Sequence, residues 1–87
     1  MSTCIIPFNE VELTCNYKQA DLLYMFNEQN SIDINSHAFD DTIIKSLTVP
    51  KILKINCNIL KLNKRFKYNK KLLNLNKLYL KIEKNIV

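Results

Sequence analysis

The N-terminal third of the chain changes from an alternating to a helical pattern of apolar residues. Residues 10–13 alternate acidic and apolar side chains, which is the period-two pattern of a β-strand. Further along, apolar residues recur at spacings of three and four, as on one face of a helix: Leu22, Met25 and Phe26. The sequence therefore predicts a strand and then a helix over about residues 17–28, with Asn16 as its cap.

Two short alternating runs in the middle of the chain predict further strands. Residues 32–34 and residues 47–49 each carry a polar residue between two branched or long apolar residues. On a strand, such alternation places the apolar side chains on one face and the polar one on the other. Pro50 ends the second run, because proline cannot donate a ladder hydrogen bond. Residues 40–42, which lie between the runs, are typical of a turn or a helix cap.

The C-terminal third fits two patterns. Apolar residues within 55–66 recur at the positions of one helical face, and residues 72–86 repeat that spacing. Residues 78–82, however, also alternate with period two, and short apolar runs do not separate a helix from a strand. A mainly helical C-terminal half therefore stands as an alternative to further strands. Residues 64–71 interrupt both patterns and predict an exposed basic turn.

The strand-like runs at 32–34 and 47–49, with a third at 78–80, indicate an internal repeat. Residues 31–55 resemble the BspA-like class of leucine-rich repeats. In that class a buried Ala-Phe pair precedes a turn, a leucine and a short strand that closes on proline. The corresponding positions in this chain are Ala38, Phe39, Thr42, Ile44, Leu47, Val49, Pro50, Leu53 and Ile55.

This resemblance implies an α+β fold, a short leucine-rich-repeat-like solenoid fragment with one N-terminal helix at about 17–28. The chain would form a single small domain over 1–87, in which stacked repeats bury one another's apolar faces. The residues expected to hold its core are Ile34, Phe39, Leu47, Val49 and Ile55. The implied function is non-catalytic protein–protein interaction with an unidentified protein partner, and Asp33 and Thr48 are the outward-facing candidates for that contact.

The composition excludes one large class of sites. The 87 residues include no glycine, so the glycine-rich loops that cradle phosphates in P-loop and dinucleotide-binding proteins are absent. Enzymatic activity is not expected either. His37 is the single histidine, and the three cysteines Cys4, Cys15 and Cys57 lack the spacing of a zinc site. We therefore expect no cofactor and no metal, and reduced, buried thiols.

Charge divides the chain into two halves. Residues 1–41 contain one lysine and seven acidic residues, whereas residues 42–87 contain twelve basic residues and one acidic residue. The basic residues are concentrated in an exposed segment, 61–71, where aromatic residues lie between them. The alternative function is accordingly a small basic nucleic-acid-binding module, because cations contact phosphates and aromatic rings stack on bases. Its candidate contacts are Lys61, Lys64, Arg65, Phe66, Lys67, Tyr68, Lys70 and Lys71.

Other interpretations of this basic segment stay open at this point. A helical segment 55–66 would give a basic amphipathic surface suited to an anionic membrane. A bland explanation also exists, since AT-rich coding favours lysine and asparagine and produces a solvated basic face. No run of 18 apolar residues predicts a transmembrane helix, and the N-terminus lacks the pattern of a secretory signal. We therefore expect an intracellular protein, with the cytoplasm as its compartment.

Overall fold

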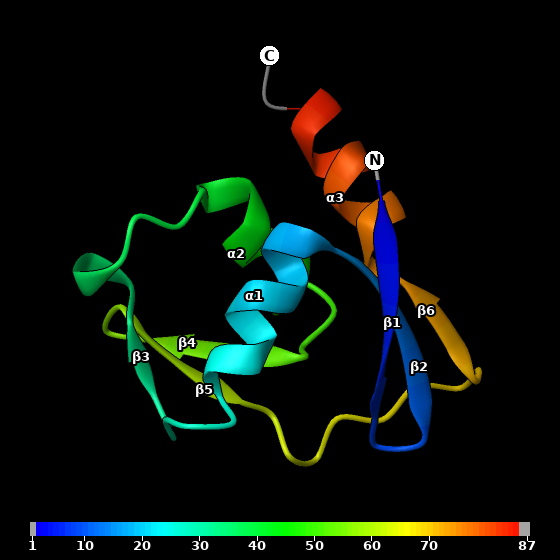
Figure 1. The fold of residues 1–87 in the computed structure, drawn as a ribbon, viewed down its shortest axis with the longest axis horizontal. Helices are drawn as coiled ribbons and strands as arrows, with labels where there is room; N and C mark the ends of the chain where they lie inside the picture. Colours follow the sequence, from blue (N-terminus) through cyan, green and yellow to red (C-terminus); the bar gives the residue numbers. More distant parts are fainter. Residues whose placement is uncertain (1, 86–87) are drawn as a thin grey trace.

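The computed structural model describes residues 2–85, which form two small sheets and three α-helices (Figure 1). The first sheet has the strand order β1-β2-β6 and the second the order β3-β5-β4. Helix α1 packs against β1 and β2, and α2 packs against α1, α3 and β4. The bounds, in chain order, are β1 Thr3–Phe8, β2 Val11–Asn16, α1 Tyr17–Met25, β3 Ile32–Asp33, a 3-10 helix Ile34–Ser36, α2 Asp41–Thr48, β4 Leu53–Asn56, β5 Ile59–Leu62, β6 Leu72–Asn74 and α3 Leu75–Lys84.

The first sheet combines an antiparallel hairpin with a parallel strand. β1 and β2 are joined by a two-residue turn in which Asn9 and Glu10 have φ angles of 49° and 67°. Two successive positive φ angles define a type I′ turn, the form whose twist matches that of the flanking strands. β6 then pairs in parallel with β2. Alternate residues of β2 are buried against the core: Val11, Leu13 and Cys15.

The second sheet contains another hairpin of the same kind. β4 and β5 are antiparallel, and the turn residues Cys57 and Asn58 have φ angles of 51° and 64°. Cys57 is exposed at this turn, so the expectation of a buried thiol at that position was wrong. One face of the sheet closes the core through fully buried side chains: Ile32, Leu53 and Leu60.

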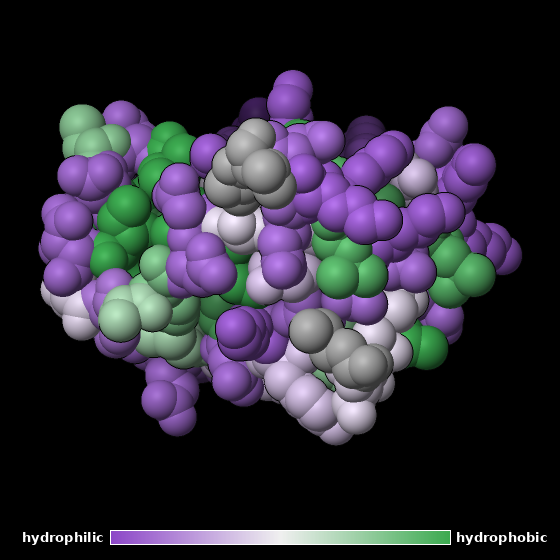
Figure 2. All heavy atoms as spheres, turned by 90° about the horizontal axis from the view of Figure 1, so that it is seen from above, coloured by the Kyte–Doolittle hydropathy of each residue, from purple (hydrophilic) through white to green (hydrophobic). Residues whose placement is uncertain are grey.

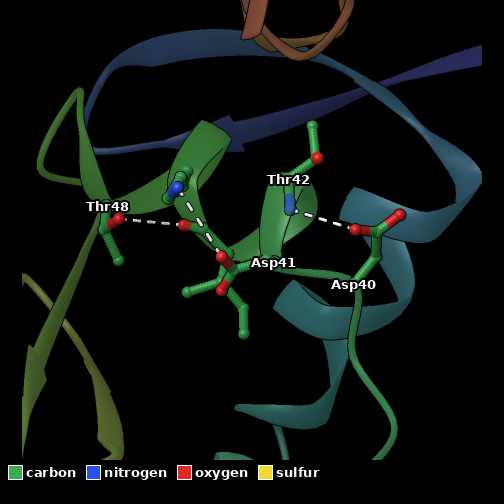
Figure 3. A network of polar contacts seen from close by, with 6 residues as sticks. Asp40, Asp41, Thr42 and Thr48 are labelled. Atoms are coloured by element: carbon green, nitrogen blue, oxygen red, sulfur yellow. Dashed lines mark hydrogen bonds and ion pairs between the residues drawn. The ribbon is translucent and has the colours of Figure 1, made fainter. Parts of the chain in front are cut away.

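Each helix begins at a side-chain cap. Asn16 and Gln19 form a reciprocal capping box at α1, which confirms the predicted cap and start of this helix. Asp40 caps α2 by accepting a hydrogen bond from the backbone N–H of Thr42 at 3.1 Å (Figure 3). Asn74 caps α3 by accepting from the backbone N–H of Lys77. These caps satisfy N–H groups that have no partner within their helix.

A buried glutamine links the helices. Gln19 has no exposed surface, and its Nε2 donates to Ser46 Oγ and to the carbonyl of Leu75, both at 2.9 Å. Its Oε1 accepts from the backbone N–H of Asn16 at 3.0 Å. One side chain therefore connects the start of α1 with α2 and with the start of α3. Satisfying each of these groups matters, because an unpaired polar group in the interior costs about 1–3 kcal/mol.

The α+β class was predicted correctly, but the leucine-rich-repeat solenoid was wrong. Stacked parallel strands are replaced by two separate sheets, each built around an antiparallel hairpin. Residues 47–49, expected as a strand, lie at the C-terminal end of α2 and at its C-cap. Ile43, Ile44 and Leu47 are buried on one face of α2. This helical spacing of apolar residues, together with the N-cap at Asp40, favours a helix here over the expected strand.

Other positions of the expected repeat also differ. Ala38 is exposed and Phe39 only half-buried, so they do not form a buried pair. Val49 and Ile55, expected in the core, are exposed by 63% and 46%. Residues 78–80, the expected third strand, lie in α3. The alternative of a mainly helical C-terminal half was wrong for residues 55–66, most of which form the β4–β5 hairpin, and correct for Leu75–Lys84.

Candidate functional site

The basic segment 61–71 connects the two sheets. It begins in β5, leaves the second sheet after Leu62 and runs along the lower edge of the molecule in Figure 1 to the start of β6. Most of it has no regular secondary structure, and its side chains are largely exposed. Leu62 and Asn63 are half-buried, and one aromatic residue of the segment is buried.

That aromatic residue, Phe66, is buried and anchors the segment. Its side chain is 5% exposed, and its ring stacks on that of Phe8 with the centroids 5.8 Å apart. The predicted role of Phe66 as a base-stacking residue is incompatible with this position. The ring is buried and already stacks on Phe8, so its faces are not accessible to a base. Phe66 instead fixes the segment to the tip of the β1–β2 hairpin.

Hydrogen bonds to backbone carbonyls fix the same segment at two further points. The Asn9 side-chain amide donates to the carbonyls of Lys64 at 3.0 Å and Phe66 at 3.1 Å. The backbone N–H of Glu12 donates to the carbonyl of Lys71 at 2.7 Å. Residues 67–70 therefore span between two attachments to the first hairpin. Their backbone is held in place while their side chains stay exposed, which reduces the entropy that binding a ligand would remove.

A surface hollow of about 390 Å³ lies between this span and the hairpin turn. Tyr68 is 39% exposed at this hollow. Glu10 is the one acidic residue in its lining, against three lysines. The lining residues are Asn9, Glu10, Val11, Lys67, Tyr68, Asn69, Lys70 and Lys71. The geometry thus brings together four of the eight predicted nucleic-acid contacts, which are three lysines and the Tyr68 ring.

Lys61 lies elsewhere, on the outer face of the second sheet. The β4–β5 register places Lys54 directly opposite Lys61, and both are exposed. With Asn56 and Ile59 they line a second hollow of about 380 Å³. Lys61 and Lys64 also line a third, neighbouring hollow of about 340 Å³. Lys54 was not predicted, because its position beside Lys61 depends on a strand pairing that the pattern of residues 55–66 did not reveal.

The cations of the segment have no carboxylate partner in the described part of the chain. The ion pair found among residues 2–85 joins Lys45 to Asp41 at 3.6 Å, within α2 (Figure 3). The acidic N-terminal half therefore does not neutralise the segment through direct contacts. Its positive charge is available to an external anion, with an interaction that salt screens.

The two residues predicted to contact a protein partner are both engaged in local hydrogen bonds. Asp33 accepts from the backbone N–H of Asn35 at 2.9 Å and so caps the 3-10 helix. The Thr48 hydroxyl donates to the carbonyl of Ile44 at 2.9 Å in the last turn of α2 (Figure 3). Because Asp33 belongs to β3 and Thr48 to α2, they do not form the outer side of one stacked sheet.

Other classes of site have little support in the part of the chain that the structure describes. Residues 2–85 contain no cluster of three histidine, cysteine or acidic side chains able to hold a metal ion. The exposed His37 packs its ring near that of Phe39, at 5.3 Å between centroids. None of the described helices has both the length and the apolar character that crossing a membrane requires. Seen from above the view of Figure 1, hydrophobic side chains form groups separated by hydrophilic ones (Figure 2).

The comparisons with known proteins add no family. No protein-family model matches the chain, and no curated protein matches it.

Proposed function

We propose that this protein binds single-stranded nucleic acid at the hollow formed by residues 67–71 and the β1–β2 turn. The observation that carries the proposal is the convergence of Lys67, Lys70 and Lys71 with the exposed ring of Tyr68. Lysines neutralise backbone phosphates, and an exposed aromatic ring stacks on an unpaired base. Both contacts come from a span whose backbone is attached at each end.

A single strand suits this site better than a duplex. Tyr68 can stack only on a base whose face is free, and bases in a duplex are already stacked on one another. The other candidate residues, Asp33 and Thr48, belong to the cap of the 3-10 helix and to α2. Both elements begin at acidic caps, and neither contains a group of cations beside an aromatic residue. Protein binding through Asp33 and Thr48 stays a prediction of the sequence, and the two residues belong to different elements, β3 and α2.

Fluorescence anisotropy with a labelled 12-nucleotide oligothymidylate or oligouridylate, measured over a salt series, tests this proposal. The triple variant Lys67→Gln/Lys70→Gln/Lys71→Gln should weaken binding and lower the slope of log K against log salt by about 2, at about 0.7 per lost phosphate contact. The matched control is Lys77→Gln/Lys81→Gln/Lys84→Gln on α3, which removes the same charge away from the hollow. Equal losses in both triples would contradict a defined site.

Tyr68→Ala separates stacking from charge. We expect affinity to fall on the order of tenfold with an unchanged salt slope, because loss of one base–aromatic stack costs about 1–3 kcal/mol. Tyr24→Ala is the matched control, since Tyr24 is also exposed but belongs to α1. Tighter binding to duplex DNA or to anionic lipid vesicles than to the single strand would overturn the proposal.

A further inference from the structure

Two cysteines face each other across the first hairpin. In the β1–β2 register, Cys4 is the direct partner of Cys15, and both thiols are free. Cys15 is fully buried, and Cys4 is half-buried and packs against the same core. Because directly paired residues of two adjacent strands point to the same side of the sheet, the two Sγ atoms lie on its inner face.

The position of this pair within the ladder fixes its backbone spacing. A two-residue turn is closed by a hydrogen-bonded pair, Phe8 with Val11, and such pairs recur at every second position of an antiparallel ladder. Cys4 and Cys15 lie four positions from the closing pair and so belong to the hydrogen-bonded class. The Cα atoms of such a pair are about 5.5 Å apart, inside the range of about 4.4–6.8 Å that a disulfide spans.

The two thiols differ in reactivity. Cys4 lies on β1, which is an edge strand, and part of its side chain is accessible. Burial, with a smaller contribution from negative charge on Cys4, raises the pKa of the Cys15 thiol to about 12. Since the thiolate is the attacking species, Cys4 is the thiol that meets an external oxidant first, and Cys15 reacts second.

We propose that Cys4 and Cys15 form an oxidation site, in which a low-molecular-weight disulfide such as oxidised glutathione converts the two thiols to a disulfide between β1 and β2. The Cys4 thiolate attacks one sulfur of the oxidant, a Cys4–glutathione bond forms, and one glutathione thiolate leaves. Cys15 then loses its proton and attacks the Cys4 sulfur, so the second glutathione thiolate leaves. Two electrons and two protons pass from the protein to the oxidised glutathione, which becomes two molecules of reduced glutathione.

The disulfide would attach the edge strand covalently to the strand that carries the core. Cβ atoms of hydrogen-bonded pairs are about 5.5 Å apart and must approach to about 4 Å, so the bond is under strain and readily reduced. We therefore expect the site to be reversible. The third cysteine, Cys57, lies at the β4–β5 turn on the opposite side of the molecule from β1 and does not compete for either partner (Figure 1).

The experiment uses the full chain with Cys57→Ser, folded and incubated with oxidised glutathione at several pH values. A protease that cleaves after Glu10 and Glu12 separates the two cysteines, so Cys4 and Cys15 peptides that stay linked without reductant report the disulfide. We expect an intact protein lighter by two hydrogens, without a glutathione adduct. Its formation should be faster at higher pH, and millimolar reduced glutathione should reverse it.

Two controls make the outcome decisive. Cys4→Ser/Cys57→Ser should remain unmodified when folded, whereas Cys15→Ser/Cys57→Ser should stop at the mixed disulfide on Cys4. Slower hydrogen exchange of the β1 amides in the oxidised protein would show that the edge strand is restrained. A stable Cys4–glutathione adduct with a free Cys15 would overturn the proposal, as would linkage that forms only in urea-unfolded protein.

Discussion

The two hairpins of this protein have the same turn but different surroundings. Both close through two residues at positive φ without a glycine, Asn9-Glu10 in the first and Cys57-Asn58 in the second. The first tip contacts Lys64 and Phe66, more than fifty residues away in the sequence, through Asn9 and Phe8. Asn58 and Cys57 are both exposed. The same backbone conformation thus carries a long-range side-chain attachment at the first tip, whereas at the second tip the Asn58 carbonyl accepts from the backbone N–H of Ile34 at 3.0 Å.

The largest expected difference in stability between the two hairpins comes from the aromatic pair Phe8 and Phe66 beside the first tip. Phe66→Ala should lower the free energy of unfolding by about 3 kcal/mol, because it leaves a cavity in the core beside Phe8. Phe66→Leu, which keeps much of the volume, should lose about 1 kcal/mol. Urea unfolding of both variants, beside Ile55→Ala in the second hairpin, measures the contrast. A loss from Ile55→Ala as large as that from Phe66→Ala would show that the two hairpins contribute alike.

Glycine substitutions at the two turns distinguish the cost of a positive φ from the contribution of the Asn9 hydrogen bonds to the basic segment. Asn9→Gly relieves the positive φ but removes two hydrogen bonds to the basic segment, so we expect a net loss of about 1–2 kcal/mol. Asn58→Gly removes no side-chain contact of this kind and should change stability by less than about 0.5 kcal/mol. Thermal or urea unfolding of the pair compares them directly. Equal effects would mean that the Asn9 amide contributes little to holding residues 64–66.

The smallest effect is expected on the outer face of the second hairpin. Lys54 and Lys61 are directly opposed, and like charges at such positions are unfavourable. Lys54→Glu replaces the repulsion by an attractive pair and should stabilise the protein by about 0.5 kcal/mol at low salt. The gain should fade at 1 M salt, where charges are screened over about 3 Å. A gain that persists at high salt would point to a cause other than charge.

The sequence predicted local features of the fold better than pairings. The start of α1 was correct because Asn16 acts within one turn of the helix. Residues 47–49 were misinterpreted because three alternating residues also fit a helix, and the cap at Asp40 was the stronger signal. The β4–β5 hairpin was missed because its turn, Asn56 to Ile59, lacks the glycine that usually marks a reversal.

The candidate site was predictable in composition and not in arrangement. The lysines and Tyr68 of the segment were identified from charge and aromatic content alone. Phe66 could not be assigned to the interior, because its burial depends on Phe8, which lies in β1 and is distant in the sequence. Lys54 was missed for the same reason as the hairpin, since only the β4–β5 register brings it opposite Lys61.

The contacts of Gln19 also have a consequence for synthesis of the chain. Its side chain needs Ser46 and the carbonyl of Leu75, and β6 pairs with β2 only after some sixty intervening residues exist. Pairings of such long sequence separation form late and slowly. A ribosome-bound chain that ends before β6 therefore lacks the hydrogen bond from Gln19 to the carbonyl of Leu75 and leaves one edge of β2 open. We expect such a nascent chain to stay protease-sensitive until β6 and α3 have emerged.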